Sequence, residues 1–382
     1  MIVKPHGGIL VNRVLSAQER KAILSYQDKL VSVEIDEEKA IEIQNIANGV
    51  FSPLQGFMNR EDFREVVHNS RLASGHAWTL PIVLSVNKAQ ASKIAKNETI
   101  ILRTKKNVIA SMHVDDIYRW DFEEYVKNVF ATSDEKHPGV QQVKAYGEYF
   151  VGGTINFLSD PISNFYSYYL TPRETRVLFK EKNWETVVGF QTRNVSHLGH
   201  EYVQKSALSI VDGLFINPVI GKKKAGDFSD QVILDSYQVL IDQFYVKERT
   251  VMSILQTEMR YAGPKEAIFH AIVRKNFGCS HFIIGRDHAG VGNFYHPFAA
   301  QKIFDFFPDL GITPIFFMSF FFCKKCNSIA NDKTCPHPQS DHVDFAGKII
   351  RDKLVHHQIP PESMMRKEVS EEILKHAQPF VE

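Results

Sequence analysis

Ten consecutive residues, QTRNVSHLGH at 191–200, form the densest group of side chains suited to binding an anion. They directly follow TVVGF, an apolar run typical of a short buried strand. If a helix begins near Asn194, His197 and His200 share one of its faces, close to an N-terminus whose free N–H groups favour anions. Arg193 adds a planar fork of donors that matches a tetrahedral oxyanion. The segment therefore predicts phosphate or sulfate chemistry.

The same ten residues also allow a purely structural interpretation, a capped helix with two hydrogen-bonded histidines. Two histidines alone would favour that interpretation, whereas Gln191, Arg193 and Asn194 within one turn favour ligand binding. Gly199 fits ligand binding too, because a residue without a side chain lets a ligand or a neighbouring backbone come close. We expect the segment to be a binding loop.

A second polar loop, GRDHAG at 285–290, follows the predicted strand 281–284. A turn bounded by glycines can place a cation, a hydrogen-bond acceptor and backbone N–H groups around one ligand. A salt-bridged structural turn is the alternative, and two such loops in matching positions after strands make it the weaker one. Since ligands bind at the carboxyl ends of parallel strands, we expect both loops to face the same ligand.

Alternating strands and helices after residue 160 must position both loops. Capping signals place helices between the strands. A capping box lies at 171–174, and a helix at 264–277 has Pro264 at its start and Gly278 as its C-terminal cap. The helix after the first loop is expected to run to about Val211 and to be closed by Gly213. This order predicts an α/β fold, a Rossmann-like parallel sheet with right-handed crossovers. The expected strands cover 186–190, 214–220, 251–255, 281–284 and 312–318.

The first 160 residues differ in pattern from the rest. Short β-like runs at 78–86 and 98–104 accompany a helical patch at 36–47, which predicts an N-terminal α+β domain rich in strands. The sequence leaves the topology of this domain open. A turn-rich junction, Ser159-Asp160-Pro161, marks its end. The predicted domains are an N-terminal α+β domain, a catalytic Rossmann-like domain and a small C-terminal module, at 1–160, 161–320 and 321–382.

Three of the four cysteines crowd together in the C-terminal module, as Cys323-x-x-Cys326 followed by Cys335 and His337. Three thiols and one imidazole at this spacing predict a structural Zn²⁺ site, since four protein ligands leave no open catalytic position. His342 could replace His337 as the fourth ligand. A reduced, metal-free cluster is the alternative interpretation.

Length and composition exclude several classes of protein. The 382 residues carry a formal net charge of +1, from 45 basic and 44 acidic residues, so no global field draws the chain to nucleic acid or anionic lipid. The N-terminus MIVKPHGG lacks the apolar stretch of a secretory signal, and no segment approaches the ~20 apolar residues of a membrane span. We expect a cytoplasmic protein without nucleic-acid or membrane partners. Cys279, the cysteine outside the cluster, is expected to be a buried, inert thiol. An RNA-binding zinc protein is the alternative from outside the enzymes. The sequence shows no clear stripe of basic residues, which disfavours it.

Several segments, read in order, resemble the motifs of the ATP sulfurylase family, and the resemblance extends from PHGG near the N-terminus to the cysteine cluster. They are FSPLQGFM, TPRETRVLF, TVVGFQTRNVSHLGHE, GKKKAGD and MRYAGPKEAIFHAIVRKNFGCSHFIIGRDHAG. The resemblance implies a sulfate adenylyltransferase of the prokaryotic zinc-containing type, with a nucleotidyl transferase domain that joins sulfate to the α-phosphate of ATP and releases pyrophosphate. Val195 stands where many members have Pro. The sequence has no GxxxxGKS/T phosphate loop, so no fused kinase is expected.

The resemblance also implies roles for the residues of both loops. The sulfate ligands that it implies are Gln191, Arg193 and the backbone of Ala289. The catalytic residues that it implies are Thr192, Arg193, Asn194, His197, His200 and Arg286. The ATP-binding residues that it implies are Gln191, Thr192, Asn194, His197, His200, Gly285, Arg286, Asp287 and His288. Mg²⁺ is expected to arrive with ATP, bound chiefly by its phosphates, and a homodimer suits the family.

Another HxGH-type nucleotidyl transferase is the closest alternative, because enzymes that adenylylate phosphopantetheine or nicotinamide nucleotides share this pattern. Class I aminoacyl-tRNA synthetases share it too, but they also need a KMSKS-type loop, which this sequence lacks. The sequence leaves open the oligomeric state, and whether the cell runs the reaction toward the sulfate adduct or toward ATP.

Overall fold

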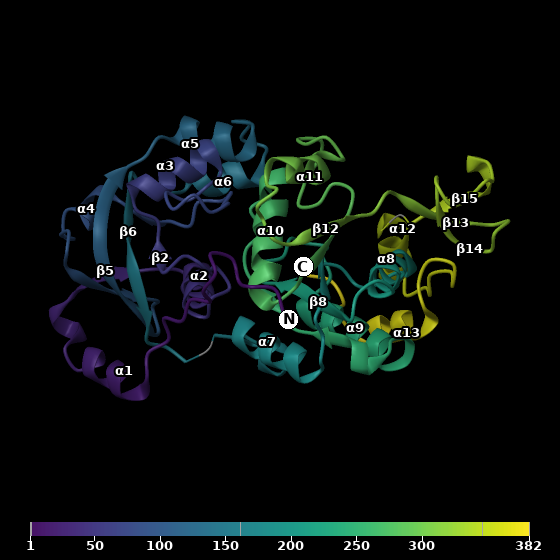
Figure 1. Ribbon diagram of the computed structural model, residues 1–382, viewed down its shortest axis with the longest axis horizontal. Helices are drawn as coiled ribbons and strands as arrows, with labels where there is room; N and C mark the ends of the chain where they lie inside the picture. The colour runs from purple at the N-terminus through teal and green to yellow at the C-terminus, as the bar shows by residue number, and fades with distance from the viewer. Residues whose placement is uncertain (1, 161, 346, 382) are drawn as a thin grey trace.

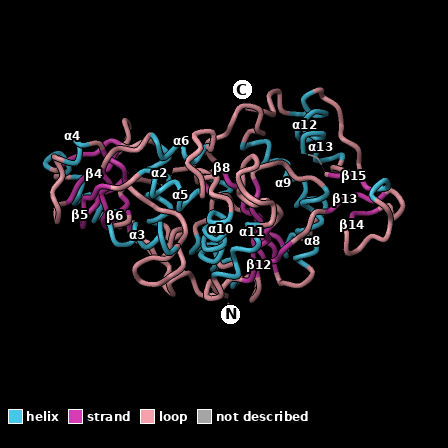
Figure 2. Tube along the Cα trace, turned by 90° about the horizontal axis from the view of Figure 1, so that it is seen from above, coloured by secondary structure: helices cyan, strands magenta, loops and turns pink. Residues whose placement is uncertain are grey.

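The computed structural model describes residues 2–160, 162–345 and 347–381, which form two sheet-based lobes and a small C-terminal module (Figure 1). Pro161, part of the predicted junction, lies outside the described residues. Seen from above in Figure 2, the N-terminal sheet and the strands of the C-terminal module occupy opposite ends, with helix α10 (Pro264–Phe277) between them. No helix in these ranges combines the length and the apolar character that crossing a bilayer requires.

The N-terminal lobe is built on a six-stranded sheet with the order β1-β4-β5-β6-β2, in which β3 also pairs with β6. Strands β1 and β4 run parallel, and the other neighbours run antiparallel. The strands are β1 (Val31–Glu34), β2 (Gly56–Phe57), β3 (Leu84–Val86), β4 (Thr99–Arg103), β5 (Val108–Arg119) and β6 (Tyr149–Phe157). The helices are α1 (Ala17–Leu24), α2 (Glu37–Ala47), α3 (Arg60–Asn69), α4 (Lys88–Ala91), α5 (Phe122–Phe130) and α6 (Pro138–Lys144). The predicted α+β character is confirmed.

Local signals explain why some of these elements were predictable. Asp36 caps α2, because its side chain accepts a hydrogen bond from the backbone N–H of Lys39. The strand expected at 78–86 forms only from Leu84 onward. Pro81 lies within the missing part, and a proline cannot donate to a strand ladder.

The second lobe is a parallel sheet with the order β10-β8-β7-β11-β12, in which β9 also pairs with β8. The strands are β7 (Val187–Thr192), β8 (Gly213–Ile220), β9 (Thr250–Met252), β10 (Leu255–Gln256), β11 (His281–Ile284) and β12 (Thr313–Phe316). The helices are α7 (Pro172–Glu181), α8 (Leu198–Leu208), α9 (Asp230–Phe244), α10 and α11 (Ala299–Lys302). The predicted Rossmann-like parallel sheet is confirmed. The predicted capping box is confirmed too, since Thr171 and Glu174 bond each other's backbone at the start of α7.

The helix after the first loop differs from the prediction at both ends. It was expected near Asn194 but begins at Leu198, because the side chain of His197 caps it there. It ends at Leu208, and Gly213 opens β8 instead of closing the helix. A Cβ on Gly213 would lie 2.2 Å from Cε3 of Trp184. This glycine therefore lets the Trp184 ring pack against the start of β8, and it does not end a helix.

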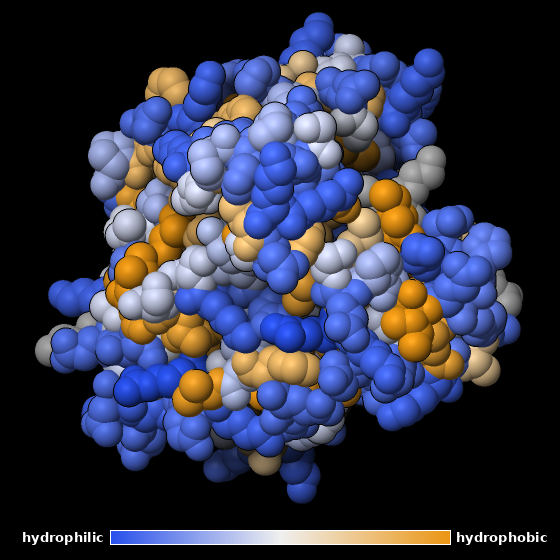
Figure 3. Space-filling view, turned by 90° about the vertical axis from the view of Figure 1, so that its right-hand side faces the viewer, coloured by the Kyte–Doolittle hydropathy of each residue, from blue (hydrophilic) through white to orange (hydrophobic). Residues whose placement is uncertain are grey.

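The C-terminal module begins with a three-stranded antiparallel sheet of β14-β13-β15, followed by two helices. These elements are β13 (Phe320–Cys323), β14 (Ser328–Asn331), β15 (His342–Asp344), α12 (Gly347–Val355) and α13 (Lys367–Lys375). Val369 and Ile373 of α13 join the apolar cluster that contains Leu240 of α9, so the last helix packs on the second lobe. On the face that carries this module, hydrophobic side chains form separate patches among hydrophilic ones (Figure 3).

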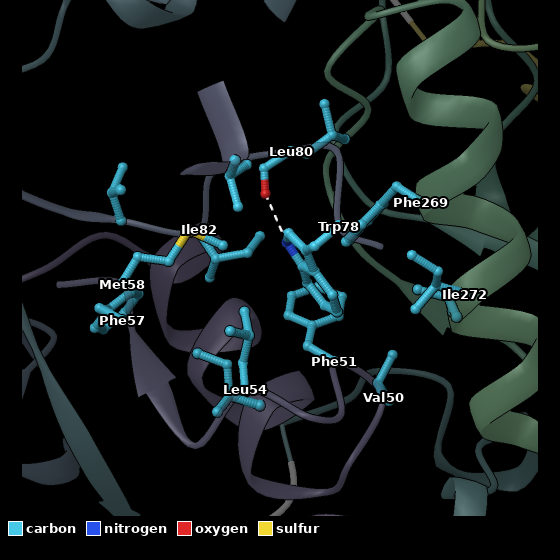
Figure 4. Packing of buried hydrophobic residues seen from close by; sticks show 14 of the residues in the cluster. Val50, Phe51, Leu54, Phe57, Met58, Trp78, Leu80, Ile82, Phe269 and Ile272 are labelled. Carbon is cyan, nitrogen blue, oxygen red and sulfur yellow. Dashed lines mark hydrogen bonds between the residues drawn. The ribbon is translucent and has the colours of Figure 1, made fainter. Parts of the chain in front are cut away.

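One apolar core joins the two lobes across α10. Phe51 and Trp78 of the N-terminal lobe pack against Phe269 of α10, with ring centroids 5.2 and 5.5 Å away, and Ile272 lies beside them (Figure 4). The indole N–H of Trp78 donates to the carbonyl of Leu80 at 2.7 Å, so this buried donor is satisfied. Helix α10 is thus held between the N-terminal lobe and the parallel sheet.

Candidate active site

The two polar loops meet at one edge of the parallel sheet. Strands β7 and β11 are hydrogen-bonded neighbours, with His281 opposite Val188 and Phe282 opposite Gly189, so their carboxyl ends lie side by side. Both loops line a cavity of about 480 Å³. The predicted site residues that line it are Gln191, His197, His200, Gly285, Arg286 and His288. The expectation that both loops face one space is confirmed.

The N-terminus of α8 is already satisfied within the protein. Nδ1 of His197 accepts from the backbone N–H groups of Gly199 (3.1 Å) and His200 (3.4 Å), and the N–H of Leu198 donates to the carbonyl of Met364 at 2.8 Å. The expected free N–H groups are therefore not available for an anion here. Because Nδ1 accepts, the proton of the neutral His197 ring is on Nε2.

His197 precedes α8 as its N-cap, so the two histidines do not share a helix face as predicted, but their rings stack with centroids 3.8 Å apart at 21°. Burial lowers the pKa of His200 to about 4. Burial and the neighbouring His200 together lower the pKa of His197 well below its ordinary value. Both imidazoles are thus neutral at neutral pH and act as hydrogen-bonding groups in the ligand-free protein.

Two phenylalanines, Phe320 at the start of β13 and Phe345, complete the wall around these histidines. The ring of Phe345 is parallel to that of His197, at 6° and 5.8 Å between centroids. A Cβ on Gly199 would lie 2.2 Å from Cε2 of Phe320, so the glycine makes room for this ring. Sequence reasoning assigned that space to a ligand or a backbone and missed both phenylalanines. For Phe320, the run FFF at 320–322, directly before Cys323, was the available signal.

Other predicted residues of the first loop lie next to the cavity without lining it. Thr192 Oγ1 donates to the carbonyl of Asn194 at 3.0 Å and accepts from its N–H at 3.1 Å, which shapes the turn after β7. Arg193 contacts the hydroxyl of Tyr261 at 3.2 Å, the carbonyl of Lys222 at 3.4 Å and the carboxylate of Asp227 at 3.9 Å. The Arg193 guanidinium therefore faces the segments 222–227 and 257–263.

The second loop is held in an unusual backbone conformation. Asp287 and Ala289 both have positive φ, at 55° and 58°, a region that non-glycine residues seldom adopt outside functional turns. The N–H of Asp287 donates to the carbonyl of Pro297 at 2.7 Å, and the N–H of Gly263 donates to that of Ala289 at 3.1 Å. The backbone of Ala289, a predicted sulfate ligand, is thus fixed by the segment 257–263.

A buried pair of histidines supports the same loop. Nε2 of His288 lies 3.1 Å from Nδ1 of His270 on α10. Burial lowers the pKa of His288 to about 3, with a further contribution from Arg274. Below them, the carboxylate of Glu266 accepts from the N–H groups of Arg260 and Ala262, at 2.9 Å each. Sequence reasoning treated this helix as scaffold and missed its polar face.

The four predicted metal ligands lie together in the C-terminal module. Donor atoms of Cys323, Cys326, Cys335 and His337 all lie within 4.8 Å of one another. The Sγ atoms of Cys326 and Cys335 are 3.7 Å apart, close to the spacing expected for two thiolates on one tetrahedral Zn²⁺ at about 2.3 Å. His342 stacks on Phe321 at 3.5 Å, and its Nε2 lies 3.7 Å from Sγ of Cys335. The three thiols and the imidazole of His337 could hold a metal ion.

The remaining cysteine agrees with the prediction made for it. Cys279 is fully buried, and burial raises the pKa of its thiol to about 12. The thiol is therefore protonated and inert.

Comparison with known proteins matches this geometry to one family. The ATP-sulfurylase family model matches residues 166–376, and that of a PUA-like domain matches residues 3–160. The chain is 53% identical to the sulfate adenylyltransferase of Pyrococcus abyssi and 49% identical to that of Thermococcus onnurineus, covering 100% of each chain. It shares its fold with a hexameric APS kinase from Thiobacillus denitrificans, with a TM-score of 0.78, 22% identity and coverage of 99% of this chain and 69% of that one. The chain therefore belongs to the ATP sulfurylase family.

Proposed function

We propose that the protein is a sulfate adenylyltransferase. A sulfate oxygen attacks the α-phosphorus of ATP and the bond from this phosphorus to the oxygen bridging to the β-phosphate breaks, giving adenosine 5'-phosphosulfate and pyrophosphate reversibly. The observation that carries the proposal is the pair of loops 191–200 and 285–290, which follow adjacent parallel strands and line one cavity. Membership of the family supplies the reaction.

Charge and position must do the catalytic work in this reaction. Sulfate is already an anion, so its attack needs no general base, and repulsion between sulfate and the triphosphate opposes the approach. We assign sulfate to Gln191, Arg193 and the backbone of Ala289. We assign the ATP phosphates to Thr192, Asn194, His197, His200 and Arg286, with Gly285, Asp287 and His288 completing the ATP site.

The contacts of Arg193 support its assignment. Its bonds to Tyr261 and Lys222 are long, at 3.2 and 3.4 Å, whereas a sulfate oxygen would offer shorter, charge-assisted bonds. Sulfate would therefore replace the Lys222 carbonyl at little cost, and the segment 221–227 would shift as it binds.

Two metal ions belong to the proposal. Mg²⁺ accompanies ATP and neutralises part of the phosphate charge. Zn²⁺ occupies the Cys323, Cys326, Cys335 and His337 cluster, since thiolates and imidazole in a tetrahedral set suit this ion. Elemental analysis after gentle purification should give one zinc per chain, and Cys326→Ser should lose it. Less than one zinc in the unaltered protein would favour a metal-free cluster.

The organisation of the protein is also proposed. We divide it into domains at 1–160, 161–320 and 321–382, and we place it in the cytoplasm as a homodimer. Light scattering of the purified protein tests the dimer, because a monomeric mass would contradict it.

Sulfate-dependent exchange of labelled pyrophosphate into ATP is the decisive experiment. We expect exchange with sulfate, and steady ATP cleavage when molybdate replaces it as a mimic whose adduct does not persist. Arg193→Ala and His200→Ala should each lower turnover ~10²- to 10³-fold while the protein stays folded. Normal rates in both variants would contradict the site assignment.

Two other outcomes would redirect the assignment. Failure of both exchange and molybdate-driven cleavage would point to another HxGH-type nucleotidyl transferase. A salt-dependent shift of labelled RNA in a gel would instead favour the RNA-binding zinc protein.

A further inference from the structure

Helix α10 turns a polar stripe toward the parallel sheet. Glu266, His270 and Arg274 are spaced by four residues, so they share one face of the helix, and each is at most 1% exposed. Glu266 and His270 support the segment 257–263 and the loop 285–290, as described above. Arg274, the third member of the stripe, contacts neither of these segments through a hydrogen bond and lies instead against the carbonyl of Asn217.

The guanidinium of Arg274 is buried without a carboxylate partner among the described residues. Its Nη2 donates to the carbonyl of Asn217 at 3.2 Å, while Nε and Nη1 have no hydrogen-bond partner within the described ranges. The face of Phe282 lies 5.5 Å away. Burial lowers the pKa of Arg274 to about 9, so it still carries a positive charge at neutral pH. Burying an unpaired charge is costly, so this arginine calls for an explanation.

Strand β7 places this charge behind Gln191. A Cβ on Gly189 would lie 2.8 Å from Cγ of Arg274, so Gly189 makes room for the arginine. Gln191 follows two residues later and points to the same face of the sheet. It also lies opposite Asn217 in the pairing of β7 with β8, and neighbouring strands are roughly 4.8 Å apart. The guanidinium therefore bonds the backbone of the residue that is paired with Gln191 on the neighbouring strand.

The two paired residues Gln191 and Asn217 each carry an unpaired acceptor. Oε1 of Gln191 and Oδ1 of Asn217 are buried and, among the residues that the structure describes, have no hydrogen-bond partner. Arg274 contributes two unpaired donors and no acceptor. One water can accept from the guanidinium and donate its two hydrogens to the two amide oxygens, which gives it the partners that a buried water requires.

We propose that Arg274 is a positioning residue for the sulfate site, acting through a buried water that bonds Oε1 of Gln191. This bond fixes the Gln191 amide so that its Nε2 donor faces the anion. The inference rests on the proposed function and deepens it, because it names the group that orients a sulfate ligand.

The test compares sulfate affinity with ATP affinity in Arg274→Met and Arg274→Lys. Arg274→Met should raise the KM for sulfate, and the Kd for sulfate measured by calorimetry, about tenfold, with less than a twofold change for ATP. Arg274→Lys, which keeps an N–H donor for the water, should recover part of the loss. Equal losses for both substrates in both variants would show a merely structural arginine and would overturn the proposal.

A matched control is Arg176→Met. Arg176 is partly buried, and it donates to three carbonyls, those of Val3, Lys275 and Asn276, at 2.7 to 2.8 Å. This variant should lower the melting temperature without a selective effect on sulfate. A selective sulfate effect here would show that any buried arginine perturbs the site, and would overturn the proposal.

The double variant Arg274→Met/Gln191→Ala shows whether Arg274 acts through Gln191. It should bind sulfate no more weakly than Gln191→Ala alone, because the positioned group is already gone. Losses that multiply, or no loss in Gln191→Ala, would overturn the proposal. Failure of the proposed function has a different signature: the unaltered protein would bind sulfate in calorimetry but show no pyrophosphate exchange.

Discussion

His197 shows how one side chain can serve both the fold and the chemistry. Its Nδ1 caps α8 by accepting from Gly199 and His200, while the ring lines the cavity. The cap fixes the proton of the neutral ring on Nε2, which is the atom left to donate to a phosphate oxygen. In the proposed reaction, stability and catalysis therefore depend on different nitrogens of the same ring.

Substitution of His197 should separate these two contributions. In His197→Asn the cap survives, because Asn is among the best capping residues, so the free energy of unfolding should change by less than about 0.5 kcal/mol. Turnover should still fall ~10²-fold, since the donor to the phosphate is lost. His197→Ala is the control and should lose about 1 kcal/mol of stability as well. Thermal unfolding and steady-state kinetics measure both, and normal turnover in His197→Asn would contradict the role in catalysis.

The low pKa values of His197 and His200 predict proton uptake on ATP binding. Burial lowers the pKa of His200 to about 4, and a bound triphosphate favours the charged imidazole and raises that pKa. Because the pKa is higher in the complex than in the free protein, ATP should bind more tightly as the pH falls toward the free-protein value. Calorimetry in two buffers of different ionisation enthalpy measures the uptake. A binding heat independent of the buffer would contradict the prediction, and His200→Asn should reduce the uptake.

At the scale of elements, the contact between Gly199 of α8 and Phe320 of β13 can be tested with a pair of substitutions. Gly199→Ala should displace Phe320, whose Cε2 lies 2.2 Å from the added Cβ, and so open one wall of the cavity. We expect the KM for ATP to rise several-fold and the module to become more sensitive to proteolysis. Adding Phe320→Ala should relieve the clash and restore the resistance to proteolysis. If Gly199→Ala alone behaves as the unaltered protein, the ring has room to move and this contact does not shape the site.

Elements with strong local signals could be predicted from the sequence, and those shaped by distant contacts could not. Helix α10 matched its prediction because Pro264 starts it and Gly278, at a φ of 106°, ends it. The start of helix α8 did not match its prediction, because histidine is not among the residues that commonly mark the N-cap of a helix. The pairing of β1 with β4 joins residues far apart in the chain, and no local pattern specifies such a contact.

The site followed the same division. The two loops are contiguous in sequence, so their polar residues could be recognised directly. Glu266, His270 and Arg274 lie within a helix that is buried on nearly every side, where apolar periodicity is uninformative. Their spacing of four in an otherwise apolar run was the signal that could have found them.

At the scale of the whole molecule, α10 couples the two lobes. Phe269 packs against Phe51 and Trp78 of the N-terminal lobe. Asn276 joins them further, because its side-chain N–H groups donate to the carbonyls of Val50 and Ser52 at 2.9 and 3.0 Å. The lobes should therefore unfold together.

Phe269→Ala tests this coupling. Loss of the buried ring should cost about 3 to 5 kcal/mol and lower the stability of both lobes in one calorimetric transition. Phe306→Ala, which removes a ring that is 76% exposed, is the control and should have little effect. Two separate transitions in the unaltered protein would contradict the coupling.

The position of α10 also limits how this enzyme can be reduced or recombined. A catalytic lobe expressed by itself would turn the Phe269 and Ile272 side of α10 to water, where the N-terminal lobe now covers it (Figure 4). Such a newly bared apolar surface invites aggregation. A minimal or chimeric version must either carry a lobe that fits this helix or replace its outward side chains with polar ones, while leaving the inward stripe of Glu266, His270 and Arg274 intact.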